Sequence, residues 1–239
     1  MNNVGFSTGA LAQGDFERAL AQMAGKPLSA VELSALRVVE LPRLLDSIPL
    51  LDLHQYAYIA VHAPSRFTNE GEGRILELLK LFPKNWPIVV HPDAIHDTPK
   101  WRALGKQLVL ENMDRRKADG RTAEELSRWF DVLPDARLCV DLAHAQQWDT
   151  TMTEAYLILT KFQNRICQIH MSELDSASRH YPLSQGSMKA FSEVAGLIPP
   201  SAAIIIESRI NEADMEAEAE KAKSVIHAPA SSKRESAVA

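Results

Sequence analysis

The sequence is poor in cysteine and has no long apolar run. Its 239 residues include two cysteines, Cys139 and Cys167, and neither belongs to a CxxC pair. Each lies in a short apolar run typical of a buried strand, so we expect a reduced, cytoplasmic protein. No apolar stretch approaches the roughly 18 residues that a membrane span requires, and no charged segment precedes an apolar one near residue 1. We therefore expect neither a membrane protein nor an exported one.

The sequence also lacks an excess of positive charge. Its 26 lysines and arginines are outnumbered by 31 aspartates and glutamates, which gives a formal net charge of −5. A chain of this charge is not attracted as a whole to a polyanion, which argues against nucleic acid as the main partner. Only a local basic patch would offer a route to nucleic acid.

Short apolar runs rich in β-branched residues alternate with segments of helical periodicity. This alternation predicts parallel strands joined by helices. The expected strands are residues 4–7, 30–33, 58–61, 88–90, 108–110, 138–140, 167–169 and 203–206. The expected helices are residues 15–24, 40–48, 72–81, 100–105, 123–132, 151–161, 187–197 and 211–225.

Eight such units, in a chain close to the usual length of roughly 250 residues, predict a (β/α)₈ TIM barrel. We expect it as a single domain over residues 1–227, followed by a disordered tail of small and polar residues at 228–239. The main alternative is an open doubly wound sheet, which carries a GxGxxG turn after its first strand. Ser7-Thr-Gly-Ala10 lacks this pattern.

Metal-ligating residue types stand at the ends of six consecutive apolar runs, from the third to the eighth. They are His62, His91, Glu111, Asp141, His170 and Glu207. In a parallel barrel the carboxyl ends of all strands form one rim, from which catalytic groups project. We therefore expect these six side chains around one cavity.

Three of them, Glu111, Asp141 and Glu207, would repel one another as ionised groups in apolar surroundings. A divalent cation removes this repulsion, and His170 completes a set of nitrogen and oxygen ligands suited to Mn²⁺, Zn²⁺, Fe²⁺ or Co²⁺. The Asp141-Leu-Ala-His144 spacing places His144 in the loop just beyond the carboxylate. There it can join a second metal or bind a ligand oxygen.

Further residues of this rim have two interpretations each. His62 and His91 are either metal ligands or hydrogen-bonded histidines at strand ends. Arg179 and His180 follow the seventh strand, and they either reach the cavity, with Arg179 as a clamp for an anion or hydroxyl, or are ordinary loop residues. The segment Arg115-Arg-Lys117 either binds a phosphate or carboxylate of the substrate or belongs to a solvated loop.

Five short motifs stand at the strand ends: Val61-His-Ala-Pro64, Leu110-Glu-Asn112, Val140-Asp-Leu-Ala-His144, Ile169-His-Met-Ser172 and Ile206-Glu-Ser208. Together they resemble the xylose isomerase-like TIM barrels, a group of sugar isomerases and epimerases and of endonuclease IV-type apurinic endonucleases. In the epimerase branch, the resemblance implies one divalent ion, often Mn²⁺, on Glu111, Asp141, His170 and Glu207. Glu111 and Glu207 would then move the proton of a carbohydrate substrate through an enediolate. His144, Arg179, His62 and His91 would contact substrate oxygens.

The endonuclease branch uses three zinc ions, and eight of its ligands have counterparts here: His62, His91, Glu111, Asp141, His144, His170, His180 and Glu207. The chain departs from that branch at Ser178, where the branch has aspartate. It is also shorter and acidic. These departures favour a metal-dependent sugar isomerase or epimerase. A zinc-dependent phosphodiesterase and a non-catalytic barrel that binds metal or sugar are the alternatives, and the resemblance leaves a homodimer open.

Overall fold

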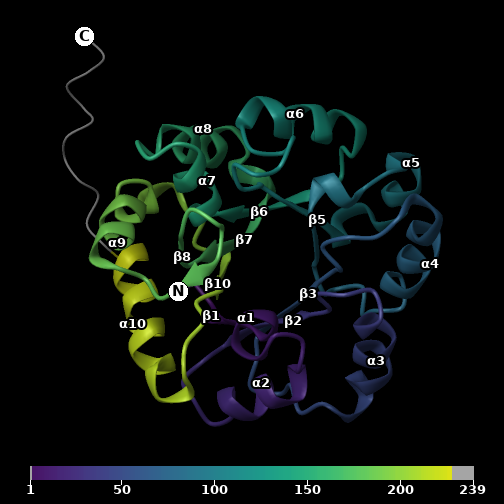
Figure 1. Ribbon diagram of the computed structural model, residues 1–239, viewed down its shortest axis with the longest axis horizontal. Coiled ribbons are helices and arrows are strands. Elements are labelled where there is room, and N and C mark those ends of the chain that lie inside the picture. The colour runs from purple at the N-terminus through teal and green to yellow at the C-terminus, as the bar shows by residue number, and fades with distance from the viewer. Residues whose placement is uncertain (1, 228–239) are drawn as a thin grey trace.

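The computed structural model describes residues 2–227, and its centre is a closed barrel of eight parallel strands (Figure 1). The strands are β1 (Val4–Ser7), β2 (Ala30–Ser34), β3 (Tyr58–His62), β4 (Ile88–Val90), β5 (Leu108–Glu111), β6 (Arg137–Asp141), β7 (Ile166–Met171) and β10 (Ala203–Ile206). Their order around the barrel is β1-β10-β7-β6-β5-β4-β3-β2, and β2 pairs with β1 to close it. The predicted TIM barrel is confirmed, with each strand at the expected place.

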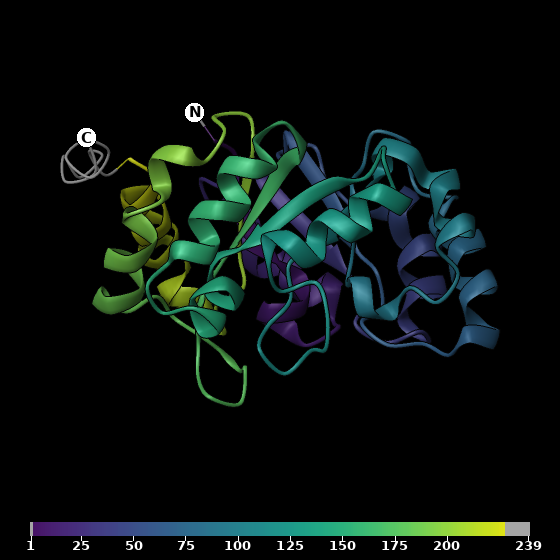
Figure 2. The ribbon, with the colours of Figure 1, turned by 90° about the horizontal axis from the view of Figure 1, so that it is seen from above.

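Helices surround the strands (Figures 1 and 2). They are α1 (Thr8–Ala12), α2 (Phe16–Met23), α3 (Glu40–Ser47), α4 (Asn69–Leu79), α5 (Thr98–Trp101), α6 (Ala123–Val132), α7 (Leu142–Trp148), α8 (Thr153–Lys161), α9 (Gln185–Ser192) and α10 (Met215–Ile226). Among residues 2–227, none of the helices has the length and apolar character that a membrane crossing needs.

The strands form because both of their faces are buried. β10 reads Ala-Ile-Ile-Ile, and all four of its residues are buried. Ile204 and Ile206 belong to the large core cluster that the strands share with the helices, whereas Ala203 and Ile205 pack with Ala30 of β2 in a separate cluster. Alternate side chains of one strand therefore fill the two sides of the barrel wall.

The contact between β1 and β2 is unusually close. A Cβ atom on Gly5 would lie 1.6 Å from the carbonyl oxygen of Ala30, so only glycine fits this position. Gly5 is paired with Ala30 in the register that closes the barrel. The first strand can close the barrel because it has no side chain here.

Two short helices that the sequence did not predict follow strands directly: α1 after β1, and α7 after β6. The expected loop at His144 is wrong, because His144 lies in α7. Asp141 caps this helix by accepting a hydrogen bond from the backbone N–H of His144 at 2.7 Å. The helix expected over 151–161 begins only at Thr153, after Met152 in the left-handed conformation.

The helix expected over residues 100–105 is divided between α5 and a 3₁₀ helix at Arg102–Gln107. Gly105 has a positive φ of 51°, which a continuous right-handed helix does not allow. The tail expected at residues 228–239 lies outside the described residues.

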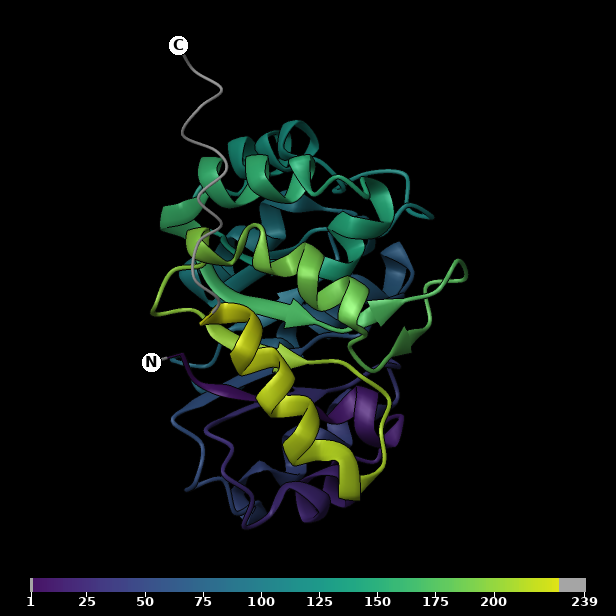
Figure 3. The same cartoon turned by 90° about the vertical axis from the view of Figure 1, so that its left-hand side faces the viewer.

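A small antiparallel hairpin, β8 (Glu173–Leu174) with β9 (His180–Tyr181), projects beyond the carboxyl ends of the barrel strands (Figure 3). The charged loop after β5 lies against it. Arg115 donates a hydrogen bond to the carbonyl of Ser176 at 3.1 Å, and Arg116 donates one to the carbonyl of Ala177 at 2.8 Å. Loop and hairpin together border one side of the rim.

Candidate metal centre

The carboxyl ends of the strands surround a cavity of about 260 Å³. Five of the histidines and carboxylates expected at this rim line it together with His180: His62, His91, Glu111, His144 and Glu207. Asp141 and His170, paired in the register of β6 and β7, complete the group through contacts with these residues. The structure therefore brings together all eight histidines and carboxylates that the sequence singled out.

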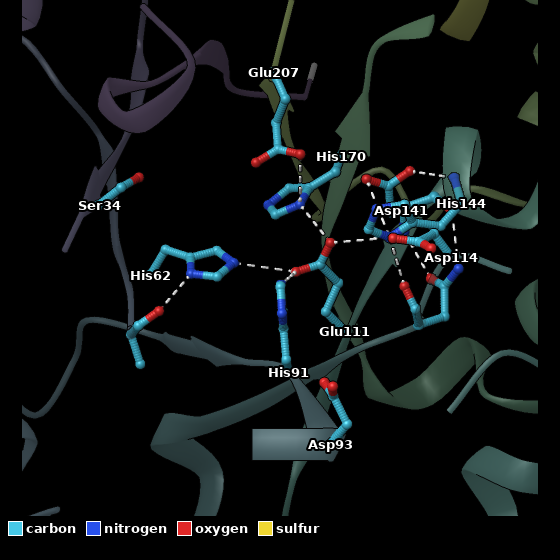
Figure 4. Close-up of polar contacts among 12 residues, drawn as sticks. Ser34, His62, His91, Asp93, Glu111, Asp114, Asp141, His144, His170 and Glu207 are labelled. Atoms are coloured by element: carbon cyan, nitrogen blue, oxygen red, sulfur yellow. Dashed lines mark hydrogen bonds and ion pairs between the residues drawn. The ribbon is translucent and has the colours of Figure 1, made fainter. Parts of the chain in front are cut away.

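Glu111, at the end of β5, is the centre of the group (Figure 4). Its Oε2 lies 3.2 Å from Nε2 of His62 and 3.3 Å from Nε2 of His91. Its Oε1 lies 3.2 Å from Nδ1 of His170 and 3.3 Å from Nδ1 of His144. The two oxygens of one carboxylate thus face two different pairs of imidazoles.

Two sets of potential ligands share this carboxylate. The first consists of Glu111, Asp141, His170 and Glu207, and the second consists of His62, His91 and Glu111. Within each set, one ligand atom from every residue lies within 4.8 Å of the others. A separation of this size allows one ion to contact all members of a set after small side-chain movements.

Two histidines are held by one ring nitrogen each. Nδ1 of His62 lies 2.8 Å from the carbonyl of Ala63, and Nδ1 of His144 lies 2.8 Å from the carbonyl of Asn112. Because a carbonyl oxygen only accepts, both of these nitrogens carry a proton. For His62, the other nitrogen, Nε2, donates to Glu111 at 3.2 Å, so loss of its proton would leave a lone pair directed at the ligand set, the arrangement typical of a metal-binding histidine.

Some buried polar atoms in this group have no hydrogen-bond partner among the described residues. They include Oδ2 of Asp141 and Nδ1 of His91. The other Asp141 carboxylate oxygen caps α7. The side-chain amide of Asn112 accepts a hydrogen bond from the Asp141 backbone N–H at 2.7 Å and donates one to the Asp141 carbonyl at 2.9 Å. Asp141 is thus rigidly placed with one free carboxylate oxygen, as a metal ligand should be.

The carboxylates have opposite pKa shifts. Burial raises the pKa of Glu111, but the charge of His170 and the hydrogen bonds from the surrounding imidazoles outweigh it and hold that pKa well below its ordinary value. Burial raises the pKa of Glu207 to about 7 and also raises that of Asp141. Three carboxylates in one buried site thus resist joint ionisation, and the residues present fit a divalent cation.

The residues of the hairpin differ in where they lie. His180 lines the cavity, with Nδ1 3.6 Å from Oε2 of Glu207, and burial with the positive charge of His144 lowers its pKa to about 3. Arg179 does not line the cavity. Its guanidinium binds Asp175 at 2.7 Å, and 63% of its side chain is exposed.

Arg116 and Lys117 line the cavity, which agrees with one of the two interpretations of the charged loop. Both are already paired. Arg116 lies 2.9 Å from Oδ2 of Asp114, and Lys117 lies 2.6 Å from Oδ2 of Asp93. Arg115 binds the hairpin and lines a different hollow beside α7.

Glu32 is a site residue that the sequence analysis missed. It lies in β2 and is fully buried, and its Oε2 is 3.1 Å from Nε2 of His170. Gln168 donates to the same oxygen at 2.6 Å and accepts from the hydroxyl of Tyr58 at 2.8 Å. Glu32 therefore anchors His170 so that Nδ1 faces Glu111 and Glu207. The sequence feature that could have identified Glu32 is a glutamate inside an otherwise apolar strand.

A model of the xylose isomerase-like TIM barrel family matches residues 96–225, which is more than half of the chain. The chain belongs to this family. The match confirms the resemblance seen in the strand-end motifs. The family includes sugar isomerase- and epimerase-like proteins as well as endonuclease IV, and most of its members are enzymes.

Solved structures of the same architecture are distant in sequence. Endonuclease IV from Thermus thermophilus has a TM-score of 0.58 at 16% identity, over 92% of this chain and 97% of that one. A xylose isomerase domain protein from Alicyclobacillus acidocaldarius subsp. acidocaldarius has a TM-score of 0.61 at 11% identity, over 95% and 98%. A xylose isomerase-like TIM barrel protein from Mycobacterium smegmatis, in complex with magnesium, has a TM-score of 0.54 at 13% identity, over 91% of each chain. No curated protein matches the chain. At these identities the likeness concerns the fold alone.

Proposed function

We propose that this protein is a metal-dependent phosphoester hydrolase whose two divalent cations share Glu111. The observation that supports this is the orientation of the Glu111 carboxylate, whose two oxygens face the two ligand sets. When bound, a pair of divalent cations lowers the pKa of water and neutralises negative charge on a phosphoryl group. Zn²⁺ and Mn²⁺ both suit a set of imidazoles and carboxylates.

The protein's own residues have distinct tasks in this proposal. Asp141, His170 and Glu207 would hold one ion with Glu111, while His62 and His91 would hold the other. Hydrogen bonds from a ring nitrogen of His62 to a backbone carbonyl and from a ring nitrogen of His170 to Glu32 fix these two rings before any ion arrives, so they need little reorganisation.

The residues around the cavity support the same chemistry. The low pKa of His180 keeps that ring neutral at physiological pH, which is the form that binds a cation. His144 and His180 both line the cavity, and their ring centroids lie 6.2 Å apart.

A sugar isomerase or epimerase is the second candidate, and it would use the four-residue set alone. The contrast between Glu111 and Glu207 favours it, because one carboxyl is held ionised while the other has a pKa of about 7. A pair of this kind suits transfer of a proton from carbon and its return. This reaction leaves the buried His62 and the partly buried His91 without a metal-binding task, which is why we place it second.

Metal analysis separates the two candidates. Protein loaded with Zn²⁺ or Mn²⁺ and freed of excess ion should contain two ions per chain in the wild type and one in a His62→Ala/His91→Ala variant. The matched control is His54→Ala/His96→Ala, which removes two histidines outside the cavity and should keep both ions.

Activity then tests the reaction. The two-ion protein should hydrolyse bis(p-nitrophenyl) phosphate, and the one-ion variant should lose at least about 100-fold in rate. One ion in the wild type, together with exchange of a ketose C–H for solvent deuterium, would establish the isomerase instead. Two ions without turnover of either substrate type would indicate a barrel that binds metal without catalysis.

A further inference from the structure

One side of the cavity carries no metal ligand except at its edges. The strands β10, β1, β2 and β3 are neighbours in the barrel, and residues at their carboxyl ends or shortly after them line this side. Its lining consists of Ser7, Gly9, Ala10, Ser34, Leu36 and Ser65, with Arg66 and Arg209 at its two ends. Figure 4 shows Ser34 on the His62 side of the cluster, apart from Asp141 and His144. We call this set of eight residues the arginine side.

The two arginines are not neutralised. Within residues 2–227, neither the Arg66 nor the Arg209 side chain makes a hydrogen bond or ion pair with another residue, whereas Arg116 and Lys117 on the opposite side are both paired. The positive charge of Arg209 acts on the cavity, because it is one of the charges that lower the pKa of His180. Two free guanidinium groups therefore border the same hollow.

The floor between the arginines offers a hydroxyl hydrogen. Ser7 and Ser34 are buried, and their Oγ atoms lie 2.9 Å apart. This pair has two hydrogens and uses one between the two oxygens, and no other described side chain or backbone group accepts the second. Because the eight residues of the arginine side include no carboxylate, an anion placed here would meet two guanidinium groups and a hydroxyl donor without facing a negative charge from these residues.

We propose that the arginine side binds a second anionic group of the substrate, a phosphate or a carboxylate, while the first lies at the metal ligands. The inference rests on the proposed function, and it names the substrate class: a small phosphoester with two anionic groups. The planar guanidinium fork binds both kinds of anion in a bidentate way. A cavity of about 260 Å³ in a chain with a net charge of −5 suits a small molecule better than a polymer.

Calorimetric binding to the metal-loaded protein tests this. The probes are alkane-α,ω-bisphosphonates with two to five carbons, ω-phosphonocarboxylates of the same lengths, and alkylphosphonates with one anionic group. The variant is Arg66→Gln/Arg209→Gln. The control is Arg18→Gln/Arg74→Gln, which removes two exposed arginines from the outer helices α2 and α4.

At one spacer length, we expect the arginine variant to bind the doubly anionic probe at least about tenfold more weakly, as expected for loss of charge-assisted hydrogen bonds. Its affinity for the alkylphosphonate and its metal content should not change. Loss confined to bisphosphonates assigns a phosphate to the arginine side, and loss confined to phosphonocarboxylates assigns a carboxylate.

Equal affinities in wild type and variant at every length would overturn the inference. So would an oligonucleotide that binds more tightly than any small probe and depends on the same arginines. The metal count of the same samples reports on the proposed function separately. A wild type with one ion defeats the hydrolase proposal, whereas two ions with no dependence on the arginines defeats only the inference.

Discussion

Glu32 offers the sharpest test of the metal centre, because it touches no ion in the proposal and acts only through His170. Replacing it by glutamine keeps the shape of the side chain and removes its charge. The structure shows what is lost: Oε2 is 3.1 Å from Nε2 of His170 and 2.6 Å from Nε2 of Gln168. Both contacts become hydrogen bonds to a neutral group.

The magnitude follows from this change. A hydrogen bond to a charged group contributes about 1.5–3 kcal/mol, and a neutral one about 0.5–1.5 kcal/mol. The hydrogen bond that orients the His170 ring and raises its basicity is therefore weakened by about 1–1.5 kcal/mol. Carboxylate partners of metal-binding histidines typically account for about 10- to 100-fold in metal affinity. We therefore expect Glu32→Gln to weaken binding of Zn²⁺ by at least about tenfold, measured by competition with a chromophoric chelator.

Glu72→Gln is the matched control. Glu72 is also a fully buried glutamate, but it accepts hydrogen bonds from Trp101 and from two backbone N–H groups beside α5, away from the cavity. This variant should lose stability and keep its Zn²⁺ affinity. Zn²⁺ affinity of Glu32→Gln within twofold of wild type, in a protein with normal circular dichroism, would refute the role of Glu32.

Three further outcomes are expected. Binding of Zn²⁺ at pH 7 should release at least about 1.5 protons, because two of the ligands carry protons there. Burial lowers the pKa of His62, but its hydrogen bond to Glu111 and nearby negative charges raise it to about 9, and burial raises the pKa of Glu207 to about 7. The affinity for Zn²⁺ should therefore fall as the pH falls below 9. Calorimetry in buffers of different ionisation enthalpy measures this, and the absence of proton release would contradict it. Gly5→Ala should cost at least about 3 kcal/mol of unfolding free energy in urea, since its Cβ has no room beside β2, and a smaller loss would show that β1 shifts freely. Trp101→Phe should cost about 1–3 kcal/mol, because buried Glu72 loses its indole donor at 2.9 Å, while the metal content should stay unchanged.

Much of the barrel was readable from the sequence. The strands are short apolar runs with both faces buried, so their composition identifies them without any knowledge of their neighbours. β10, with Ala-Ile-Ile-Ile, is such a case. Since parallel strands end on one rim, residue types at those ends, such as Glu111 and Asp141, could be assigned to one cavity in advance.

Local geometry after the strands was less predictable. Helix α7 begins immediately at the end of β6, because Asp141 serves as its cap as well as a member of the ligand set. Of the two interpretations of Arg179, the cavity residue is wrong, because its guanidinium pairs with Asp175, four residues earlier, and it does not line the cavity. Short loops are decided by such local hydrogen bonds, which strand periodicity does not report.

The sequence alone determined which residue types stand at the rim, because a strand end is a local property. Only the tertiary structure decided which of them meet. Glu32 and His170 are separated by 138 positions and come together because β2 and β7 face each other across the barrel. Arg66 and Arg209 likewise border one hollow only because β1 pairs with both β2 and β10. Such contacts depend on the register in which the barrel closes, and that register is set by the whole core rather than by any one segment.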